Sequence, residues 1–275
     1  MAEREERKRN KQKTKKILCL SIVAVSISIL LFYEISGKAF CDDTQLNGII
    51  YNVVTRSLGG VICIMLMWYC SFIRLLAPCK SRSFIGNILL TLHCWLVVIN
   101  NFPFIAYFTG AVEVTSPWYF VALYALECFC IGLFEETAFR GCIFMLMLQR
   151  KDTPSQKWNF ISIVVSSAVF GLVHLANLLA GAGIVPVLMQ IGYSFLIGGM
   201  CSVVLLRTGN LWYCILLHGI YNFCGGVIPE LGKGKMWDMP TVIITAVLAT
   251  AVTVYMLYIL YKTPANPNWR KEKKI

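Results

Sequence analysis

Long apolar runs separated by short polar segments dominate the pattern along this chain. A helix needs about 20 consecutive apolar residues to cross the hydrocarbon part of a bilayer. Runs near that length occur at Ile17–Ser36, Ile49–Ala77, Phe84–Phe108, Trp118–Leu148, Phe160–Ala180, Val185–Leu206, Leu211–Ile228 and Thr241–Tyr261. The pattern predicts an all-α fold, a polytopic membrane bundle of about eight transmembrane helices. The first run lacks a small-residue cleavage site, so a retained anchor is favoured over a cleaved signal peptide.

The loops between these runs alternate in charge. Basic residues gather after the second, fourth and sixth runs, whereas the other loops are acidic or nearly neutral. The basic loop residues are Lys80, Arg82, Arg150, Lys151, Lys157 and Arg207. Because Lys and Arg are retained on the cytoplasmic side, these loops and both termini are expected in the cytoplasm.

The composition fits the same class. The chain is 57% hydrophobic and 14% charged, whereas a soluble domain carries about 25% charged residues. Soluble enzymes, disordered scaffolds and nucleic-acid modules are therefore excluded. Residues 1–16 and 262–275 hold +9 of the +11 net charge. We interpret 1–16 and 263–275 as basic cytoplasmic tails beside one membrane domain, 17–262, with membrane lipid and not nucleic acid as the partner.

A few charged residues interrupt the fourth apolar run. Glu135, Glu136 and Arg140 form the pattern E-E-x-x-x-R. Glu136 and Arg140 are four residues apart on a helix and can form an ion pair. Glu135 is rotated by about 100° from Glu136 and can face a different neighbour. An ion pair accounts for Glu136 and Arg140 but leaves the second carboxylate unexplained, and a charge inside the bilayer is costly.

Polar residues also occur in two later runs. His174 lies in the fifth, and His218 lies in the seventh with Asn222 one turn later on the same face. Because polar groups in membrane helices turn inward, these residues and Glu135 are expected to face one cavity. A carboxylate and an imidazole can activate a water molecule, and a His–Asn pair can stabilise an oxyanion. These are the groups needed to attack a carbonyl.

The ordered motifs resemble the CPBP family, which contains CAAX proteases and bacteriocin-processing enzymes formerly grouped as Abi proteins. The family pattern is E-E-x-x-x-R, then F-x-x-x-H, then H-x-x-x-N on separate helices. Here it is represented by Glu135-Glu136-x-x-x-Arg140, Phe170-x-x-x-His174 and His218-x-x-x-Asn222. The resemblance covers a protease-like core of about residues 117–226.

The resemblance implies an intramembrane glutamic endopeptidase. Glu135 and His174 would activate the attacking water, His218 and Asn222 would stabilise the oxyanion, and Glu136 and Arg140 would support Glu135. No cofactor is then expected. Zinc held by Glu135, His174 and His218 is the alternative, because one carboxylate and two histidines also suit a catalytic zinc with an open position. The sequence contains no H-E-x-x-H, which favours the metal-free mechanism.

The substrate is left open by the sequence. The resemblance implies a peptide or a lipidated protein, with peptide precursors, prenylated C-termini and bacteriocin-related substrates as the classes. Short loops and the absence of any soluble domain favour a bacterial plasma-membrane protein. The positions of Glu135, His174 and His218 along their spans predict a site near the middle of the membrane that is reached from the cytoplasm. The rival functions are a non-proteolytic scaffold or bacteriocin-immunity factor, and a proton-coupled transporter that uses the same charges as a relay.

Overall fold

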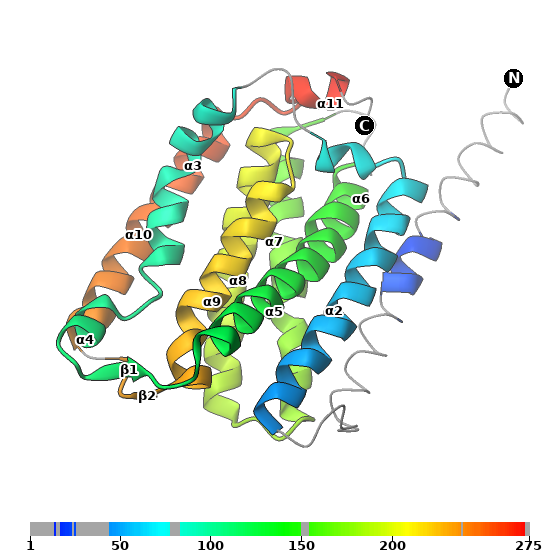
Figure 1. Cartoon of the computed structure of the whole chain (residues 1–275). Coiled ribbons are helices and arrows are strands. Elements are labelled where there is room, and N and C mark those ends of the chain that lie inside the picture. The colour runs from blue at the N-terminus through cyan, green and yellow to red at the C-terminus, as the bar shows by residue number, and fades with distance from the viewer. Residues whose placement is uncertain are drawn as a thin grey trace, which may run out of the picture.

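A computed structural model describes residues 14, 17–23, 25, 44–77, 83–149, 154–237 and 239–272. Most of these residues form helices that run along one common direction (Figure 1). The longer helices are α2 (Thr44–Tyr69), α3 (Phe84–Ile99), α5 (Trp118–Glu136), α7 (Gln156–Val173), α8 (Ile184–Thr208), α9 (Trp212–Leu231) and α10 (Met239–Lys262). The short elements are η1 (Ile73–Leu76), α4 (Phe104–Phe108), β1 (Val112–Val114), the π-helix η2 (Thr137–Phe144), α6 (Met145–Leu148), η3 (His174–Leu178), β2 (Gly232–Gly234) and α11 (Asn268–Glu272).

The predicted membrane spans match the helices closely. Six helical segments of the described residues are long and apolar enough to cross a membrane, with α5, η2 and α6 forming one of them and α7 with η3 another. Helix α3 is apolar but shorter, with 16 residues. The predicted span Ile17–Ser36 lies largely outside the described residues. The chain is therefore an all-α, multi-pass membrane protein.

The predicted span Phe84–Phe108 is wrong as one continuous helix. Helix α3 ends at Ile99, and the separate helix α4 begins at Phe104. Pro103 lies at the break and lacks the N–H group that a continuing helix requires. The residue before a proline is also disfavoured in helical conformation, so the helix stops before it reaches Pro103.

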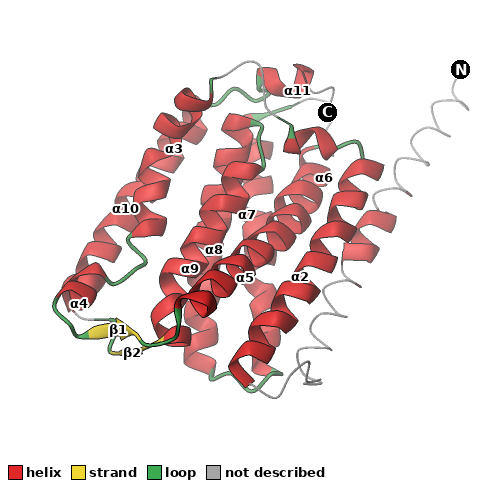
Figure 2. Cartoon of the chain, viewed as in Figure 1, coloured by secondary structure: helices red, strands yellow, loops and turns green. Residues whose placement is uncertain are grey.

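The two ends of the bundle are closed differently. At one end β1 pairs with β2 as a short antiparallel ribbon (Figure 2), and Lys233 Nζ lies 2.7 Å from Glu113 Oε1. At the other end the indole N–H of Trp269 in α11 donates to the Leu206 carbonyl oxygen at 2.8 Å. The ribbon links two loops that the sequence predicts to be outside, and α11 lies with the loops predicted to be inside.

The helices are packed most closely in the part that carries the predicted motifs. Helix α5 packs against α2 and α9, and α7 packs against α8. Helices α3 and α10 lie side by side at one edge of the bundle (Figure 1). Few residues of α10 are buried, and many of its large apolar side chains are exposed. Such a surface suits contact with lipid.

Candidate active site

Two glycines allow α5 and α9 to approach closely beside the predicted motifs. A Cβ atom at Gly132 would lie 2.8 Å from the Ile215 carbonyl oxygen, and one at Gly219 would lie 3.3 Å from that of Cys128. Glycine at such positions lets helix backbones touch in a membrane. Gly132 is one turn before the two glutamates and Gly219 directly follows His218. The crossing therefore brings the motifs of α5 and α9 together.

A buried cluster of three charged or titratable groups lies beyond this crossing. Glu136 Oε1 lies 2.9 Å from Arg140 Nη1 and 2.8 Å from His218 Nδ1. The ion pair predicted between Glu136 and Arg140 is thereby confirmed, with the two side chains 0% and 1% exposed. The histidine as a second partner of Glu136 was not predicted, because the sequence does not specify how α9 is rotated against α5.

His218 also faces the other glutamate. Its Nε2 atom lies 3.5 Å from Glu135 Oε2. A carboxylate can only accept hydrogen bonds, so the contact with ionised Glu136 makes His218 Nδ1 the donor. That leaves Nε2 as the atom directed toward Glu135. One imidazole thus connects a fully buried carboxylate with a carboxylate that is 15% exposed.

Arg140 lies within a π-helical segment, Thr137–Phe144. A π-helix is rare and often marks a functional site. The hydroxyl group of Thr137 donates to the carbonyl oxygens of Leu133 and Phe134, at 2.7 and 2.9 Å, where the helix changes type. The guanidinium of Arg140 extends to α8, where a Cβ atom at Gly198 would lie 2.7 Å from Arg140 Nη2. A larger side chain at Gly198 would displace the arginine.

The aromatic ring of Phe170 packs against three members of the predicted motifs. Arg140 Cζ lies 4.3 Å from the ring centroid, which is a cation–π contact. The rings of His174 and His218 contact Phe170 edge-on, with centroids 5.4 and 5.7 Å away. Phe170 is 2% exposed. It therefore holds the two imidazoles and the guanidinium in fixed positions relative to one another.

His174 lies where α7 changes into the 3₁₀-helix η3. Two contacts attach this segment to α8. Gly171 allows a close approach, since its Cβ would lie 2.9 Å from the Ile191 carbonyl oxygen, and the Asn177 side-chain N–H donates to Gln190 Oε1 at 2.7 Å. These contacts fix the position at which His174 leaves the helix.

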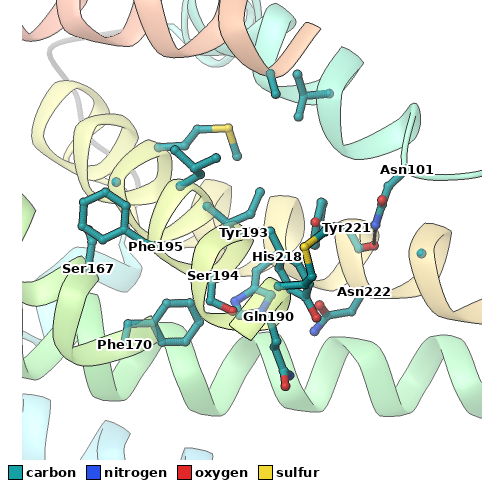
Figure 3. Close-up of a pocket in the computed structure, with 18 of the residues that line it drawn as sticks. Asn101, Ser167, Phe170, Gln190, Tyr193, Ser194, Phe195, His218, Tyr221 and Asn222 are labelled. Carbon is teal, nitrogen blue, oxygen red and sulfur yellow. Dashed lines mark hydrogen bonds between the residues drawn. The ribbon is translucent and has the colours of Figure 1, made fainter. Parts of the chain in front are cut away.

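Glu135, His174, His218 and Asn222 line one cavity of about 1200 Å³. The expectation that three helices direct these residues to a single cavity is thus confirmed. Glu136 and Arg140 do not line it and lie behind His218. In Figure 3, Phe170, His218 and Asn222 lie along the cavity, with Gln190 and Tyr193 of α8 beside them.

Several polar residues of the cavity were not predicted from the sequence. They are Arg56, Asn101, Gln190, Tyr193, Ser194 and Tyr221. An arginine and a glutamine inside apolar runs are visible signals. The sequence does not show which way these side chains point. In a nearly uniform apolar helix, helical periodicity does not distinguish the face toward lipid from the face toward the cavity.

One group of potential metal ligands occurs among the described residues. Glu136, Cys201 and Cys214 place ligand atoms within 4.8 Å of one another, whereas Glu135, His174 and His218 form no such group. One carboxylate and two thiolates suit zinc. However, the guanidinium of Arg140 is bonded to the same carboxylate and would repel a cation. The ten cysteines of the described part of the chain are free.

A comparison with protein families matched residues 116–224 to the model described as "Type II CAAX prenyl endopeptidase Rce1-like". Residues 116–224 of the chain are thus similar to the Rce1-like family. The matched segment begins before α5 and ends in α9, so it contains all of the motif residues. Comparisons with curated proteins and with solved structures each found no match. The similarity of this segment to the Rce1-like family indicates a CAAX-type intramembrane endopeptidase.

Proposed function

We propose that the protein is a metal-free glutamic endopeptidase that hydrolyses a peptide bond in the cavity between α5, η3 and α9. The observation that carries this proposal is the convergence of Glu135, His174, His218 and Asn222 on one cavity, with Glu136 and Arg140 buried behind them. A structural ion pair would explain only the last two residues. The cavity supplies the remaining groups that peptide hydrolysis requires.

In the proposed reaction, Glu135 accepts a proton from a water molecule that His174 orients, and the oxygen of that water attacks the peptide carbonyl carbon. The carbonyl oxygen becomes an oxyanion, which accepts hydrogen bonds from His218 Nε2–H and Asn222 Nδ2–H. The C–N bond then breaks, and the proton held by Glu135 passes to the leaving nitrogen. The products are a new carboxylic acid and a new amine, which together hold both protons of the water.

The contact between His218 and Glu136 supports the oxyanion role. Since Nδ1 donates to Glu136, donation from Nε2 requires the imidazolium form of His218. The carboxylate of Glu136, 2.8 Å from Nδ1, would balance the positive charge of that form. Arg140 Nη1 lies 2.9 Å from the same Glu136 oxygen and holds this carboxylate in place. Glu136 and Arg140 are therefore positioning residues that act through His218.

The proposed substrates are peptides or lipidated proteins that reach the cavity from the cytoplasm. The family description names prenylated CAAX sequences, and peptide precursors, including bacteriocin-related ones, form the second class. Exposed apolar faces of α3 and α10 beside the cavity are compatible with a substrate that carries a lipid. We propose a plasma-membrane location in a bacterial cell.

The proposal is tested with purified protein in detergent and synthetic peptides from both classes. Glu135→Gln is expected to reduce kcat by about 100-fold or more, because it removes the general base. The matched control is Glu113→Gln, which changes a glutamate that is 58% exposed and does not line the cavity. An unchanged cleavage rate in Glu135→Gln would overturn the proposed role. The wild-type protein and Glu135→Gln are also compared in cells. If the wild-type protein cleaves none of the peptides and Glu135→Gln gives the same cellular phenotype as the wild type, a scaffold or immunity factor is favoured.

A further inference from the structure

The cavity contains a tyrosine that the proposed reaction does not use. Tyr193 lies about 13 Å from the start of α8, a helix of 25 residues. It is thus well inside the predicted span, away from the membrane surfaces where tyrosines are enriched. Tyr193 lines the same cavity as the four residues proposed to act in catalysis, and it is 41% exposed.

The hydroxyl group of Tyr193 has no hydrogen-bond partner among the residues that the structure describes. The ring of Tyr193 packs against that of Tyr221, with centroids 5.9 Å apart. A phenylalanine would make the same ring contact, so packing does not account for the hydroxyl group. Because an unpaired polar group is costly in apolar surroundings, a tyrosine O–H inside a protein usually has a partner. The free O–H group of Tyr193 therefore indicates a ligand in the cavity.

Contacts between α7 and α8 define the level of Tyr193. A Cβ atom at Gly171 would lie 2.9 Å from the Ile191 carbonyl oxygen and 3.6 Å from the Phe195 backbone nitrogen. Tyr193 lies between these two α8 residues in the chain, so it is level with Gly171. His174 follows Gly171 by three residues, which corresponds to about 4–5 Å along the helix. Tyr193 is therefore within one helical turn of the level of His174.

Two further contacts connect Tyr193 with α9 and α5. Its ring partner Tyr221 directly precedes Asn222, and the Asn101 side-chain N–H holds this part of α9 by donating to the Tyr221 carbonyl oxygen at 2.9 Å. The phenol of Tyr193 also interacts electrostatically with the carboxylate of Glu135. Figure 3 shows Tyr193, Tyr221 and Asn222 in one part of the cavity. The hydroxyl group is thus near both the proposed base and the proposed oxyanion donors.

We propose that Tyr193 is a further catalytic residue, whose O–H group donates a hydrogen bond to the oxyanion of the tetrahedral intermediate. The inference rests on the proposed endopeptidase function, since that function forms the oxyanion beside His218 and Asn222. An oxyanion has three lone pairs, and these two residues supply two donors. Tyrosine is one of the side chains that form oxyanion holes. Tyr193 supplies the third donor and transfers no proton.

The movement of charge during the reaction makes this hydrogen bond stronger in the transition state. Before the attack, the negative charge is on Glu135, within electrostatic range of the Tyr193 phenol. As the water attacks, its proton neutralises Glu135 and the negative charge appears on the substrate oxygen. A hydroxyl group rotates to suit its acceptor and can follow this charge. An interaction made mainly in the transition state raises kcat without tightening substrate binding.

The first measurement compares Tyr193→Phe with the wild-type protein in detergent. The substrates are synthetic peptides of both proposed classes, beginning with an octapeptide that ends in S-farnesyl-Cys-Val-Ile-Met. We expect kcat to fall by about 100-fold, as is typical for the loss of one oxyanion donor. KM should stay unchanged because the ring remains. Tm should also stay unchanged, since the hydroxyl group has no partner in the described part of the chain.

A phosphinate version of the cleaved peptide separates an oxyanion donor from a structural role. Its tetrahedral, negatively charged phosphinate group replaces the scissile bond and mimics the intermediate. The inhibition constant of this peptide should rise in Tyr193→Phe by the factor by which kcat/KM falls. Binding of the uncleaved peptide, measured in a Glu135→Gln background, should be the same with Tyr193 and with Tyr193→Phe.

Tyr124→Phe is the matched control, because it removes a tyrosine hydroxyl group from the same cavity. Tyr124 lies 11 residues before Glu135 on α5, which corresponds to about 16 Å along the helix. This variant should keep the wild-type kcat and the wild-type inhibition constant. A wild-type kcat in Tyr193→Phe, an equal loss in Tyr124→Phe, or a loss that appears in KM alone would each overturn the role of Tyr193.

The same assays distinguish a failure of this role from a failure of the proposed function. If the wild-type protein cleaves no peptide of either class, the endopeptidase proposal fails and the role of Tyr193 fails with it. If the wild-type protein cleaves a peptide, Glu135→Gln does not, and Tyr193→Phe cleaves it at the wild-type rate, the endopeptidase proposal stands and the role of Tyr193 alone fails.

Discussion

Glu136 of α5 and His218 of α9 are joined by a 2.8 Å contact between Oε1 and Nδ1 at a place where both side chains are almost fully buried. This contact is the link between the structural ion pair of Glu136 with Arg140 and the cavity that His218 lines. A carboxylate in this position orients the imidazole by accepting the hydrogen bond from Nδ1–H. The pair thus couples the stability of the bundle to the chemistry proposed for the site.

The first prediction separates these two contributions. Glu136→Gln leaves the guanidinium of Arg140 buried without a carboxylate, and we expect a loss of about 3–5 kcal/mol in stability, as for other broken buried ion pairs. The double variant Glu136→Leu with Arg140→Met removes both charges. It should recover much of that stability, measured as Tm in detergent, while peptide cleavage stays lost because His218 has no acceptor for Nδ1. Recovery of cleavage in the double variant would contradict a positioning role for Glu136.

The second prediction concerns the crossing of α5 and α9. In Gly132→Ala the new Cβ would lie 2.8 Å from the Ile215 carbonyl oxygen, so the two helices must separate. We expect a loss of about 1–3 kcal/mol in stability and a fall in cleavage rate, because Glu135 and His218 move apart. Gly48→Ala in α2 is the matched control, since no atom lies within 4 Å of its Cβ position.

Two quantities are measured for both Gly132→Ala and Gly48→Ala: Tm in detergent and kcat with a peptide substrate. Gly48→Ala should keep the wild-type kcat and should not lower Tm. A wild-type kcat in Gly132→Ala would show that the close approach of the two backbones is not needed for the site.

The third prediction concerns metal dependence. In the proposed mechanism the site's own carboxylate activates the water, so the purified protein should contain no stoichiometric zinc, and its cleavage rate should be unchanged after dialysis against a chelator. Zinc content is measured by mass spectrometry on the same sample. Loss of cleavage that zinc restores would replace the glutamic mechanism with zinc held by Glu135, His174 and His218.

The sequence predicts most of the helices of this protein, but not how the helices are rotated against one another. The pair of Glu136 and Arg140 was predictable because both residues lie on one helix at a spacing of four. The contact of Glu136 with His218 depends on a crossing between helices, for which Gly132 and Gly219 were the available signal. Pro103 itself indicated the break between α3 and α4. The apolar run continues across Pro103, however, and therefore favoured one continuous helix.

The π-helix had no comparable signal. Thr137–Phe144 contains no proline, and its apolar residues fit an α-helix as well. What distinguishes the segment is its surroundings: Arg140 reaches the Phe170 ring and the Gly198 backbone on two other helices. Such contacts between helices can override the local preference of a segment for an α-helix. They cannot be predicted from a single sequence.

The last prediction tests Phe170 as the element that orders the site. Phe170→Leu keeps an apolar side chain but removes the ring that contacts Arg140, His174 and His218. We expect a loss of about 1–3 kcal/mol in stability, from the cation–π contact and the unfilled volume. We also expect kcat to fall more than 10-fold with a smaller change in KM, because small displacements of catalytic groups slow the chemical step. Phe108→Leu is the control, since that phenylalanine is 80% exposed. An equal effect of the two substitutions on kcat would mean that the Phe170 ring does not order the imidazoles.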